Sequence, residues 1–168
     1  MLNTIDLFAG CGGLTEGFKQ SGHFKMLAAV EWDKDAHATL RDRLMHAHGY
    51  KDAAKQCILA DIQDTKSLIH GKDADDEFPS HEGLDALVND KKVDVIIGGP
   101  PCQAYSVAGR IRDENGMHED YRNYLFESYM AVVNHFKPAA CIFENVPGML
   151  SAAPGGISII ERISAAFK

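Results

Sequence analysis

Gly98-Gly99-Pro100-Pro101-Cys102-Gln103 follows directly on the apolar run Val93-Asp94-Val95-Ile96-Ile97. A β-branched run of this kind predicts a buried strand, and two glycines followed by two prolines end it abruptly. Proline fixes φ and lacks an N–H, so Pro100 and Pro101 hold the next residues in a stiff, extended path. The strand therefore presents the thiol of Cys102 at its carboxyl end, which is the edge where open α/β sheets bind ligands.

Cys102 has two interpretations on sequence alone. A free cysteine is usually a small core residue. Its position after a Pro-Pro stop, outside any apolar period, favours a nucleophile, whose reactive form is the thiolate. The other cysteines, Cys11, Cys57 and Cys141, show neither disulfide nor metal spacing. We therefore expect no metal site, and a reducing, cytoplasmic environment.

The composition is that of one soluble globular domain spanning residues 1–168, with 45% hydrophobic and 24% charged residues. No apolar stretch approaches the length of a membrane span, and the first residues carry no basic or apolar leader, so neither a membrane nor secretion is expected. The formal net charge is −7. That sign is wrong for a surface that grips phosphates unaided, so a nucleic-acid substrate would need contacts from elsewhere.

A glycine turn follows the first predicted strand. Residues 3–8 read as a strand, Ala9-Gly10-Cys11-Gly12-Gly13 as a tight turn, and residues 14–21 as a helix. This arrangement is typical of the first unit of a nucleotide-binding sheet, where glycines let the backbone approach a ligand at a helix N-terminus. Thr15 stands where the G-x-G-x-x-G pattern requires its third glycine, so a plain tight turn remains the alternative.

Two further strands are predicted to end in acidic residues. Residues 26–31 end in Glu31-Trp32, about 20 positions after the glycine turn, where such folds bind ribose hydroxyls. Trp32 is suited to stacking on a purine, although a core-capping aromatic is an equal alternative. Residues 56–60 lead to Asp61-Ile62. Asp61 either accepts a hydrogen bond from an adenine amino group or caps the following segment.

The remaining segments complete an alternation of strands and helices. A helix is expected over residues 34–48, and an acidic, irregular insert over 64–92 with one short helix near 82–88. The histidines of these segments are expected on solvated surfaces: His37, His46, His48, His70 and His81. Residues 104–120 are predicted to form a long loop, which inside a compact domain is more often an active-site lid than filler.

The C-terminal part adds a strand and two helices. Residues 121–136 and 158–167 read as helices, and residues 139–143 as a buried strand that ends at Glu144. Five strands alternating with helices predict an α/β fold with a doubly wound parallel sheet. Acidic and reactive residues follow four of these strands, which places one composite site at the carboxyl edge. Glu144 is the acid expected to work with Cys102.

Three stretches resemble signature motifs of the cytosine-5 DNA methyltransferases, in that family's order: Asp6-Leu7-Phe8-Ala9-Gly10-Cys11-Gly12-Gly13, Gly99-Pro100-Pro101-Cys102-Gln103 and Glu144-Asn145-Val146. Weaker matches lie at Glu31-Trp32, at Asp61-Ile62 and over residues 122–125. The similarity covers about residues 3–150, apart from the insert at 64–92. It implies a Rossmann-like methyltransferase fold, incomplete at the C-terminus.

The resemblance also implies the site. Cys102 would attack C6 of a flipped cytosine in double-stranded DNA, while Glu144 binds and protonates N3. The residues that would hold S-adenosylmethionine are Phe8, Gly10, Gly12, Gly13, Glu31, Trp32, Asp61, Ile62, Pro101 and Leu125. The residues that would contact DNA are Gln103, Ser106, Arg110, Arg112, Arg122 and Asn145. The implied activity is DNA methylation of the restriction–modification type.

The family's later features have no counterpart before Lys168: a Gln-x-Arg-x-Arg motif, a target-recognition domain and a segment that completes the cofactor pocket. We therefore expect a missing C-terminal half, in the same chain or in a second one. Two alternatives remain open. The substrate could be cytosine in transfer RNA, or the chain could be a non-catalytic subunit that binds S-adenosylmethionine.

Overall fold

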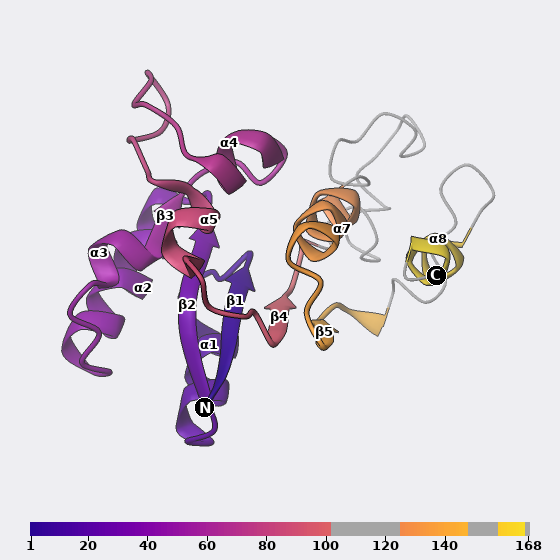
Figure 1. Ribbon diagram of the computed structural model, residues 1–168, viewed down its shortest axis with the longest axis horizontal. Coiled ribbons are helices and arrows are strands. Elements are labelled where there is room, and N and C mark those ends of the chain that lie inside the picture. Colours follow the sequence, from indigo (N-terminus) through magenta and orange to yellow (C-terminus); the bar gives the residue numbers. More distant parts are fainter. Residues whose placement is uncertain (102–124, 148–157, 167–168) are drawn as a thin grey trace.

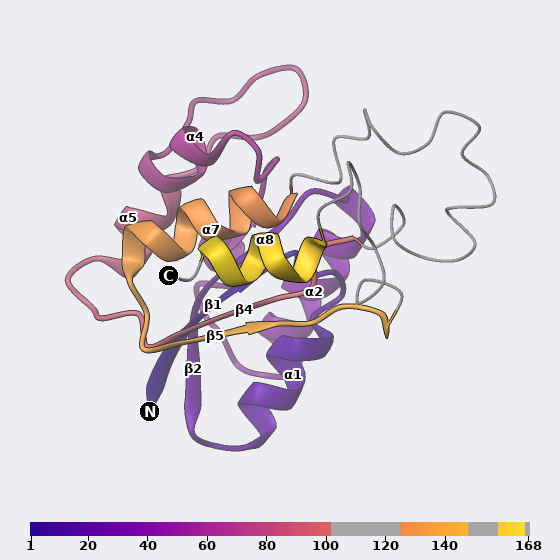
Figure 2. The same cartoon turned by 90° about the vertical axis from the view of Figure 1, so that its right-hand side faces the viewer.

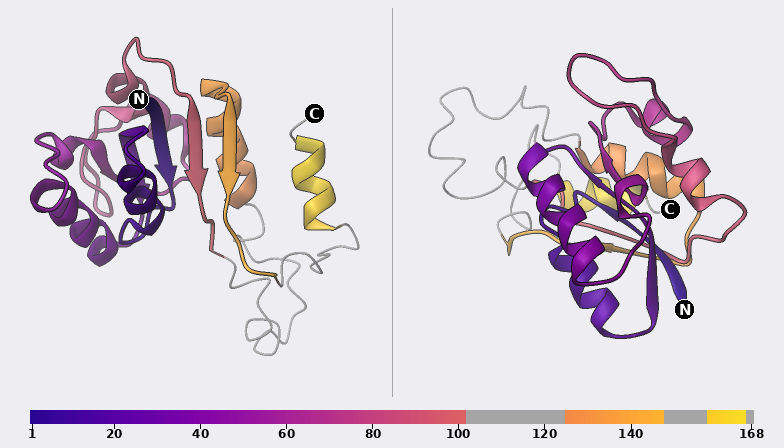
Figure 3. Two further views of the ribbon diagram at one scale, coloured as in Figure 1. Left: turned by 90° about the horizontal axis from the view of Figure 1, so that it is seen from below. Right: turned by 90° about the vertical axis from the view of Figure 1, so that its left-hand side faces the viewer.

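The computed structural model describes residues 1–101, 125–147 and 158–166, and within them the backbone forms one parallel five-stranded sheet (Figure 1). The strands are β1 (Leu2–Leu7), β2 (Phe24–Glu31), β3 (Cys57–Leu59), β4 (Val95–Gly98) and β5 (Ala140–Phe143). Seen from below, β1, β4 and β5 run side by side in the same direction (Figure 3, left). The predicted doubly wound parallel sheet is confirmed.

The strand order is β3-β2-β1-β4-β5, so the chain leaves the centre in one direction and then returns to build the other half. The order reverses between β1 and β4, where Leu7 pairs with Gly98. In open α/β sheets this switch point leaves a crevice outside the carboxyl ends of the strands. The ends of β1 and β4 therefore frame the candidate site.

Helices cover both faces of the sheet (Figure 2). One layer holds α1 (Gly13–Gln20), α2 (Lys34–His46) and α3 (Ala53–Gln56). The opposite layer holds α4 (Thr65–His70), α5 (Gly83–Val88) and α7 (Leu125–Phe136), and α8 (Ile159–Ala166) lies beyond the β5 edge of the sheet (Figures 1 and 3). Because β4 is covered on both faces, its sequence is a near-continuous apolar run.

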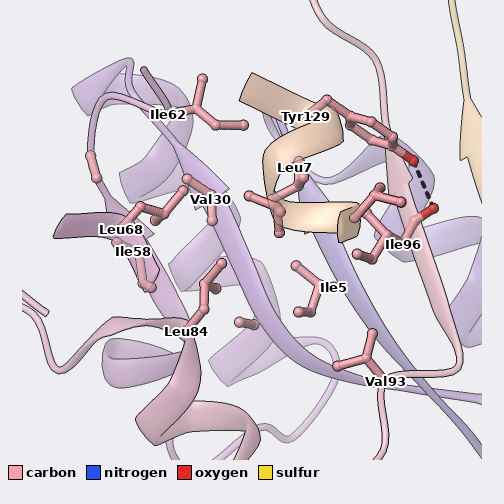
Figure 4. Close-up of a cluster of buried hydrophobic side chains, with 14 of the residues drawn as sticks. Ile5, Leu7, Val30, Ile58, Ile62, Leu68, Leu84, Val93, Ile96 and Tyr129 are labelled. Carbon is pink, nitrogen blue, oxygen red and sulfur yellow. Dashed lines mark hydrogen bonds between the residues drawn. The ribbon is translucent and has the colours of Figure 1, made fainter. Parts of the chain in front are cut away.

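The larger core cluster packs the second helical layer against the sheet (Figure 4). Ile5 and Leu7 of β1, Ile96 of β4 and Tyr129 of α7 are all fully buried in it. Each large apolar side chain buried in this way contributes about 1.5–3 kcal/mol. The smaller cluster lies on the other face, where Leu40 and Leu44 of α2 pack on the sheet.

The insert over residues 64–92 is more ordered than the sequence predicts. It contains α4 as well as the expected α5, and Lys72 and His81 form an antiparallel bridge between them. A six-residue helix shows too few turns for an apolar period. The aspartate before α4 is a typical N-cap residue: the Asp64 side chain accepts a hydrogen bond from the Ser67 N–H.

Two boundaries also differ from the predictions. α2 ends at His46, two residues before the predicted end, and α3 was not predicted at all. The helix expected over 121–136 is described only from Leu125 onward. A four-residue helix such as α3 is decided by what it packs against, because so short a helix is not stable by itself.

Three of the histidines expected on solvated surfaces are engaged in the fold. The ring Nε2 of His37 lies 3.0 Å from the Cys57 carbonyl oxygen, and that of His48 contacts the Glu16 carboxylate. Both ring nitrogens of His81 are buried and have no hydrogen-bond partner among the described residues. Burial lowers the pKa of His81. The expectation holds for His46 and His70, which are exposed.

Candidate cofactor and catalytic site

A cavity of about 240 Å³ opens at the carboxyl edge of the sheet. Its lining comes from the ends of β1, β2, β3 and β4 and from the start of α7. The lining residues are Phe8, Val30, Glu31, Trp32, Ala60, Asp61, Ile62, Gln63, Gly99, Pro101 and Leu125. Seven of the ten residues predicted to hold the cofactor are thus brought together from positions more than a hundred residues apart.

The three predicted glycines are not in this lining; they shape the turn that precedes α1. Gly10 and Gly12 have φ values of 55° and 89°, in the left-handed region that favours glycine. A Cβ at Gly12 would lie 2.6 Å from Cδ1 of Leu40. Gly12 therefore permits the close packing of the turn on α2, while Gly13 begins α1.

Phe8 has the same left-handed conformation, with φ at 59°, although it is not a glycine. A non-glycine residue in this region costs on the order of 1–2 kcal/mol. The next residue returns to the sheet, since the Ala9 N–H donates to the Val30 carbonyl oxygen over 3.0 Å. This local kink at the end of β1 places Phe8 in the cavity wall.

Glu31 ties the glycine turn to the end of β2. Its Oε2 accepts from the Gly10 N–H over 2.6 Å, and its Oε1 accepts from the N–H groups of Trp32 and Asp33 over 2.9 and 2.8 Å. Three of the roughly four lone-pair positions of the carboxylate are occupied. Glu31 is therefore held in a fixed orientation and keeps acceptor capacity for one ligand hydroxyl.

Asp61 and its neighbours form another wall. Asp61 Oδ1 accepts from the Gln63 N–H over 2.9 Å, so the carboxylate is ordered by its own turn. The capping role that was the alternative for Asp61 belongs to Asp64 instead. Val30, Ala60, Gln63 and Gly99 also line the cavity and were not predicted. Each lies next to a predicted residue in the chain or two positions from it. This proximity in sequence was the only indication that they would line the cavity.

The buried carboxylate of Asp6 was missed as a supporting residue. Asp6 is fully buried, and its Oδ2 accepts a hydrogen bond from the Thr15 hydroxyl. Burial raises the pKa of Asp6 to about 7, against the lowering effect of the Thr15 hydrogen bonds. Thr15, which breaks the glycine pattern, therefore links α1 to β1.

The ends of β4 and β5 meet at Glu144, the predicted acid. The Glu144 N–H donates to the Gly98 carbonyl oxygen over 2.9 Å, continuing the pairing of β5 with β4. A Cβ at Gly99 would lie 2.8 Å from Oε2 of Glu144. The carboxylate thus packs against the glycine that begins the Gly-Pro-Pro-Cys segment.

Asn145 ties the two strand ends together. Its side-chain amide donates to the Pro100 carbonyl oxygen over 3.2 Å, and its Oδ1 accepts from the Val146 N–H. Its DNA contact stays a prediction. Cys102, Gln103, Ser106, Arg110, Arg112 and Arg122 lie outside the described residues.

The cavity suits an adenosine-containing ligand. Phe8, Ile62 and Leu125 supply apolar walls for a flat base, and Trp32, which is 53% exposed, supplies an aromatic face at the rim. The carboxylates of Glu31 and Asp61 supply acceptors for hydroxyl and amino groups. Among the described residues, no cluster of histidine, cysteine or acidic side chains is placed to hold a metal ion, and no helix is long and apolar enough to cross a membrane.

A doubly wound parallel sheet, a glycine turn after β1 and a cavity at the switch point define a Rossmann-like, nucleotide-binding fold. Comparison with family models specifies the family. The model of the C-5 cytosine-specific DNA methylases matches residues 2–167. The chain belongs to this family.

Curated relatives agree with this assignment. The chain is 33% identical to the type II methyltransferase M.Bpa9945I of Bacillus paralicheniformis, over 97% of this chain and 44% of the relative. It is 35% identical to the type II methyltransferase M.AgeI of Thalassovita gelatinovora, over 93% of this chain and 30% of the relative. The chain therefore spans less than half the length of these relatives.

Solved structures share the fold. A DNA modification methyltransferase encoded within a prophage (E. coli) superposes with a TM-score of 0.59 at 28% identity, covering 89% of this chain and 33% of the other. The Dnmt2 methyltransferase of S. pombe gives a TM-score of 0.58 at 16% identity, covering 99% and 40%. The second likeness bears on the fold alone.

Proposed function

We propose that this chain carries the cofactor and catalytic half of an enzyme that transfers a methyl group from S-adenosylmethionine to C5 of cytosine in DNA. The observation that supports it most is the pairing of two features at one sheet edge. The cavity at the switch point opens beside Gly99, and the Glu144 carboxylate packs on the same residue.

In this proposal the chain's own residues bind and orient the cofactor. S-adenosylmethionine supplies an electrophilic methyl group on a sulfonium. Phe8, Ile62 and Leu125 would enclose the adenine, while Glu31 and Asp61 would accept hydrogen bonds from the ribose and the adenine amino group. The glycine turn would lie against the methionine portion, since its backbone approaches closely at a helix N-terminus.

Cys102 would supply the nucleophile. C5 of cytosine is too unreactive to accept a methyl group directly, so the Cys102 thiolate would form a bond to C6, and the electrons of the C5–C6 double bond would move toward C5. C5 then takes the methyl group. Loss of the C5 proton and departure of the thiolate restore the double bond. The base must first be flipped, because C5 and C6 are shielded within the stack.

Glu144 would act at N3 of the flipped cytosine. A proton donated or shared at N3 withdraws electrons from the ring and favours attack at C6. The Glu144 backbone is held to Gly98, and its carboxylate lies against the start of the segment that leads to Cys102. This arrangement supports a shared task for the two residues.

DNA is favoured over RNA as the substrate by the names of the relatives above 25% identity, which are type II and DNA modification methyltransferases. A non-catalytic subunit is less favoured, because both the cysteine and the acid are retained. We also propose that activity requires a further segment, in the same chain or a second one, since the matched relatives are more than twice as long.

Covalent trapping tests the function. Duplex DNA containing 5-fluorocytosine cannot lose its C5 substituent as a proton, so an adduct with Cys102 would persist. The chain is incubated with S-adenosylmethionine and this duplex, alone and with the part of M.Bpa9945I that the match leaves uncovered added as a second polypeptide. We expect a denaturation-resistant complex in the combined sample.

Two variants and one substrate arm make the result specific. Cys102→Ser should abolish the complex, whereas Cys11→Ser, which replaces an exposed cysteine within the glycine turn, should retain it. A fluorocytosine transfer RNA in place of the duplex tests the RNA alternative. Binding of S-adenosylhomocysteine without any adduct or methyl transfer in either sample would support the non-catalytic subunit instead.

A further inference from the structure

Tyr129 joins the two strands that end at the catalytic edge. It is fully buried in α7, and its hydroxyl donates to the Ile96 carbonyl oxygen of β4 over 2.9 Å (Figure 4). The same hydroxyl lies 3.4 Å from the Ile142 carbonyl oxygen of β5. One phenolic O–H therefore spans two neighbouring strands of the sheet.

These contacts lie two residues before the bonded pair Gly98 and Glu144, on β4 and β5 respectively. Two residues after Ile96, the Gly98 carbonyl oxygen accepts from the Glu144 N–H, and Glu144 itself is two residues after Ile142. Beyond that pair come Gly99, which packs on the Glu144 carboxylate, and Pro100, which Asn145 holds. A change in the alignment of β4 and β5 at Tyr129 would reach Glu144 at the next ladder bond.

The ring of Tyr129 is as closely packed as its hydroxyl. It meets the Phe143 ring edge to face, with centroids 5.2 Å apart and planes at 90°. A Cβ at Gly98 would lie 3.1 Å from Cε2 of Tyr129. Gly98 therefore makes room for the tyrosine, as Gly99 makes room for the acid. Burial and the nearby Cys141 raise the pKa of Tyr129, so the hydroxyl stays a donor.

Tyr129 also reaches the cofactor cavity through its own helix. Leu125, which lines the cavity, is four residues earlier in α7 and lies on the same helix face. The buried apolar face of α7 seats this helix on the sheet, and phenylalanine at position 129 would keep that packing. Loss of the hydroxyl should therefore act on the alignment of β4 and β5 rather than on the position of Leu125.

We propose that Tyr129 is a positioning residue for methyl transfer, whose hydroxyl holds β4 and β5 in the alignment that sets Glu144 against Gly99. This inference rests on the proposed function for its consequence in catalysis. The alternative interpretation is that Tyr129 only fills space in the core. The hydroxyl separates the two views, because phenylalanine keeps the ring contacts and removes only the link between the strands.

Tyr129→Phe is compared with Tyr50→Phe as the matched control. Tyr50 also has a hydroxyl bonded to the backbone, accepting from the Met26 N–H over 3.3 Å, but it lies near the start of β2, away from the catalytic edge. The first measurement is amide hydrogen exchange on the isolated chain. We expect the Glu144 N–H to exchange at least about tenfold faster in Tyr129→Phe and at the parent rate in Tyr50→Phe.

The second measurement separates kcat from KM in the combined sample described above. For Tyr129→Phe we expect kcat to fall at least about tenfold while KM for S-adenosylmethionine stays within about twofold. Both constants should stay within about twofold of the parent for Tyr50→Phe. A role in packing alone would lower thermal stability in both variants without this selective loss of kcat.

The outcomes are distinguishable. If the parent transfers no methyl group and forms no adduct, the proposed function fails, and the exchange of the Glu144 N–H still decides whether Tyr129 holds the strand ends. An unchanged Glu144 exchange rate in Tyr129→Phe would overturn the inference. So would equal losses of kcat in the two tyrosine variants.

Discussion

The hydroxyl of Thr15, in the first turn of α1, donates a hydrogen bond to the fully buried carboxylate of Asp6 in β1. The second oxygen of that carboxylate, Oδ1, has no partner among the described residues. A carboxylate with one satisfied oxygen is costly to ionise inside a protein. Asp6 therefore couples the stability of the glycine turn to pH.

The first prediction concerns this coupling. The pKa of Asp6 is raised from 3.8 to about 7, so the folded state keeps a proton that the unfolded state has already lost. The free energy of unfolding should fall as pH rises between these two values. The Asp6 contribution to this loss is about 3 kcal/mol between about pH 5 and about pH 8.

Urea unfolding at these two pH values checks it. Asp6→Asn should remove the Asp6 contribution of about 3 kcal/mol to this loss, because the amide cannot ionise. Asp90→Asn, at an exposed position after α5, serves as the control and should leave the pH dependence as in the parent. Equal pH dependence in the parent and in Asp6→Asn would contradict the assignment.

The second prediction concerns Gly98. An added Cβ would lie 2.5 Å from the Leu7 carbonyl oxygen, which belongs to the backbone of the neighbouring strand and cannot swing away. Gly98→Ala should therefore lower the free energy of unfolding by about 1–3 kcal/mol, the usual cost of overpacking.

Gly17→Ala is the matched glycine substitution. It lies in α1, is exposed, and has no atom within 4 Å of an added Cβ. It should stabilise by about 0.5–1 kcal/mol, because alanine is the better helix former. Denaturant titration of both variants gives the comparison. A Gly98→Ala variant as stable as the parent would show that β1 and β4 separate more easily than their packing implies.

The third prediction separates two neighbouring aspartates. Asp61 lines the cavity, whereas Asp64, three residues later, caps α4. Asp61→Ala should weaken binding of S-adenosylhomocysteine by roughly tenfold to a hundredfold, since a hydrogen bond to a charged acceptor contributes about 1.5–3 kcal/mol.

Calorimetric titration measures the affinity. Asp64→Ala should lose about 1 kcal/mol of stability through its cap and leave the affinity unchanged. If the Asp61 variant bound as tightly as the parent, its carboxylate would have only the local turn role seen in its bond to Gln63.

The fourth prediction uses Trp32 as a reporter. It is the only tryptophan of the chain, lies in the cavity lining and is 53% exposed. A bound adenosine moiety would cover the indole, so the emission should shift to shorter wavelength during titration with S-adenosylhomocysteine. Trp32→Phe removes the signal and controls for absorption by the ligand. Binding seen by calorimetry with no spectral change would place the ligand away from Trp32.

Local sequence determined the elements that are long or sharply bounded. The apolar runs before Gly98 and Glu31 predicted β4 and β2, because such runs pack on both faces of a parallel sheet. The run Ala9–Gly13 predicted a tight turn, and the structure has positive φ at Gly10 and Gly12, a conformation that other residues take only at a steric cost. These properties depend on neighbours in the chain and are readable there.

Only the tertiary structure decided the strand order, the cavity and the supporting contacts. Phe8 and Leu125 line one cavity at the switch point, and the Tyr129 hydroxyl reaches Ile96, because α7 packs on the sheet. Thr15 reads as a defect in a glycine pattern until the fold places it beside Asp6. Such contacts join segments far apart in sequence, and they form only when burial of apolar surface offsets the entropy of closing the chain between them.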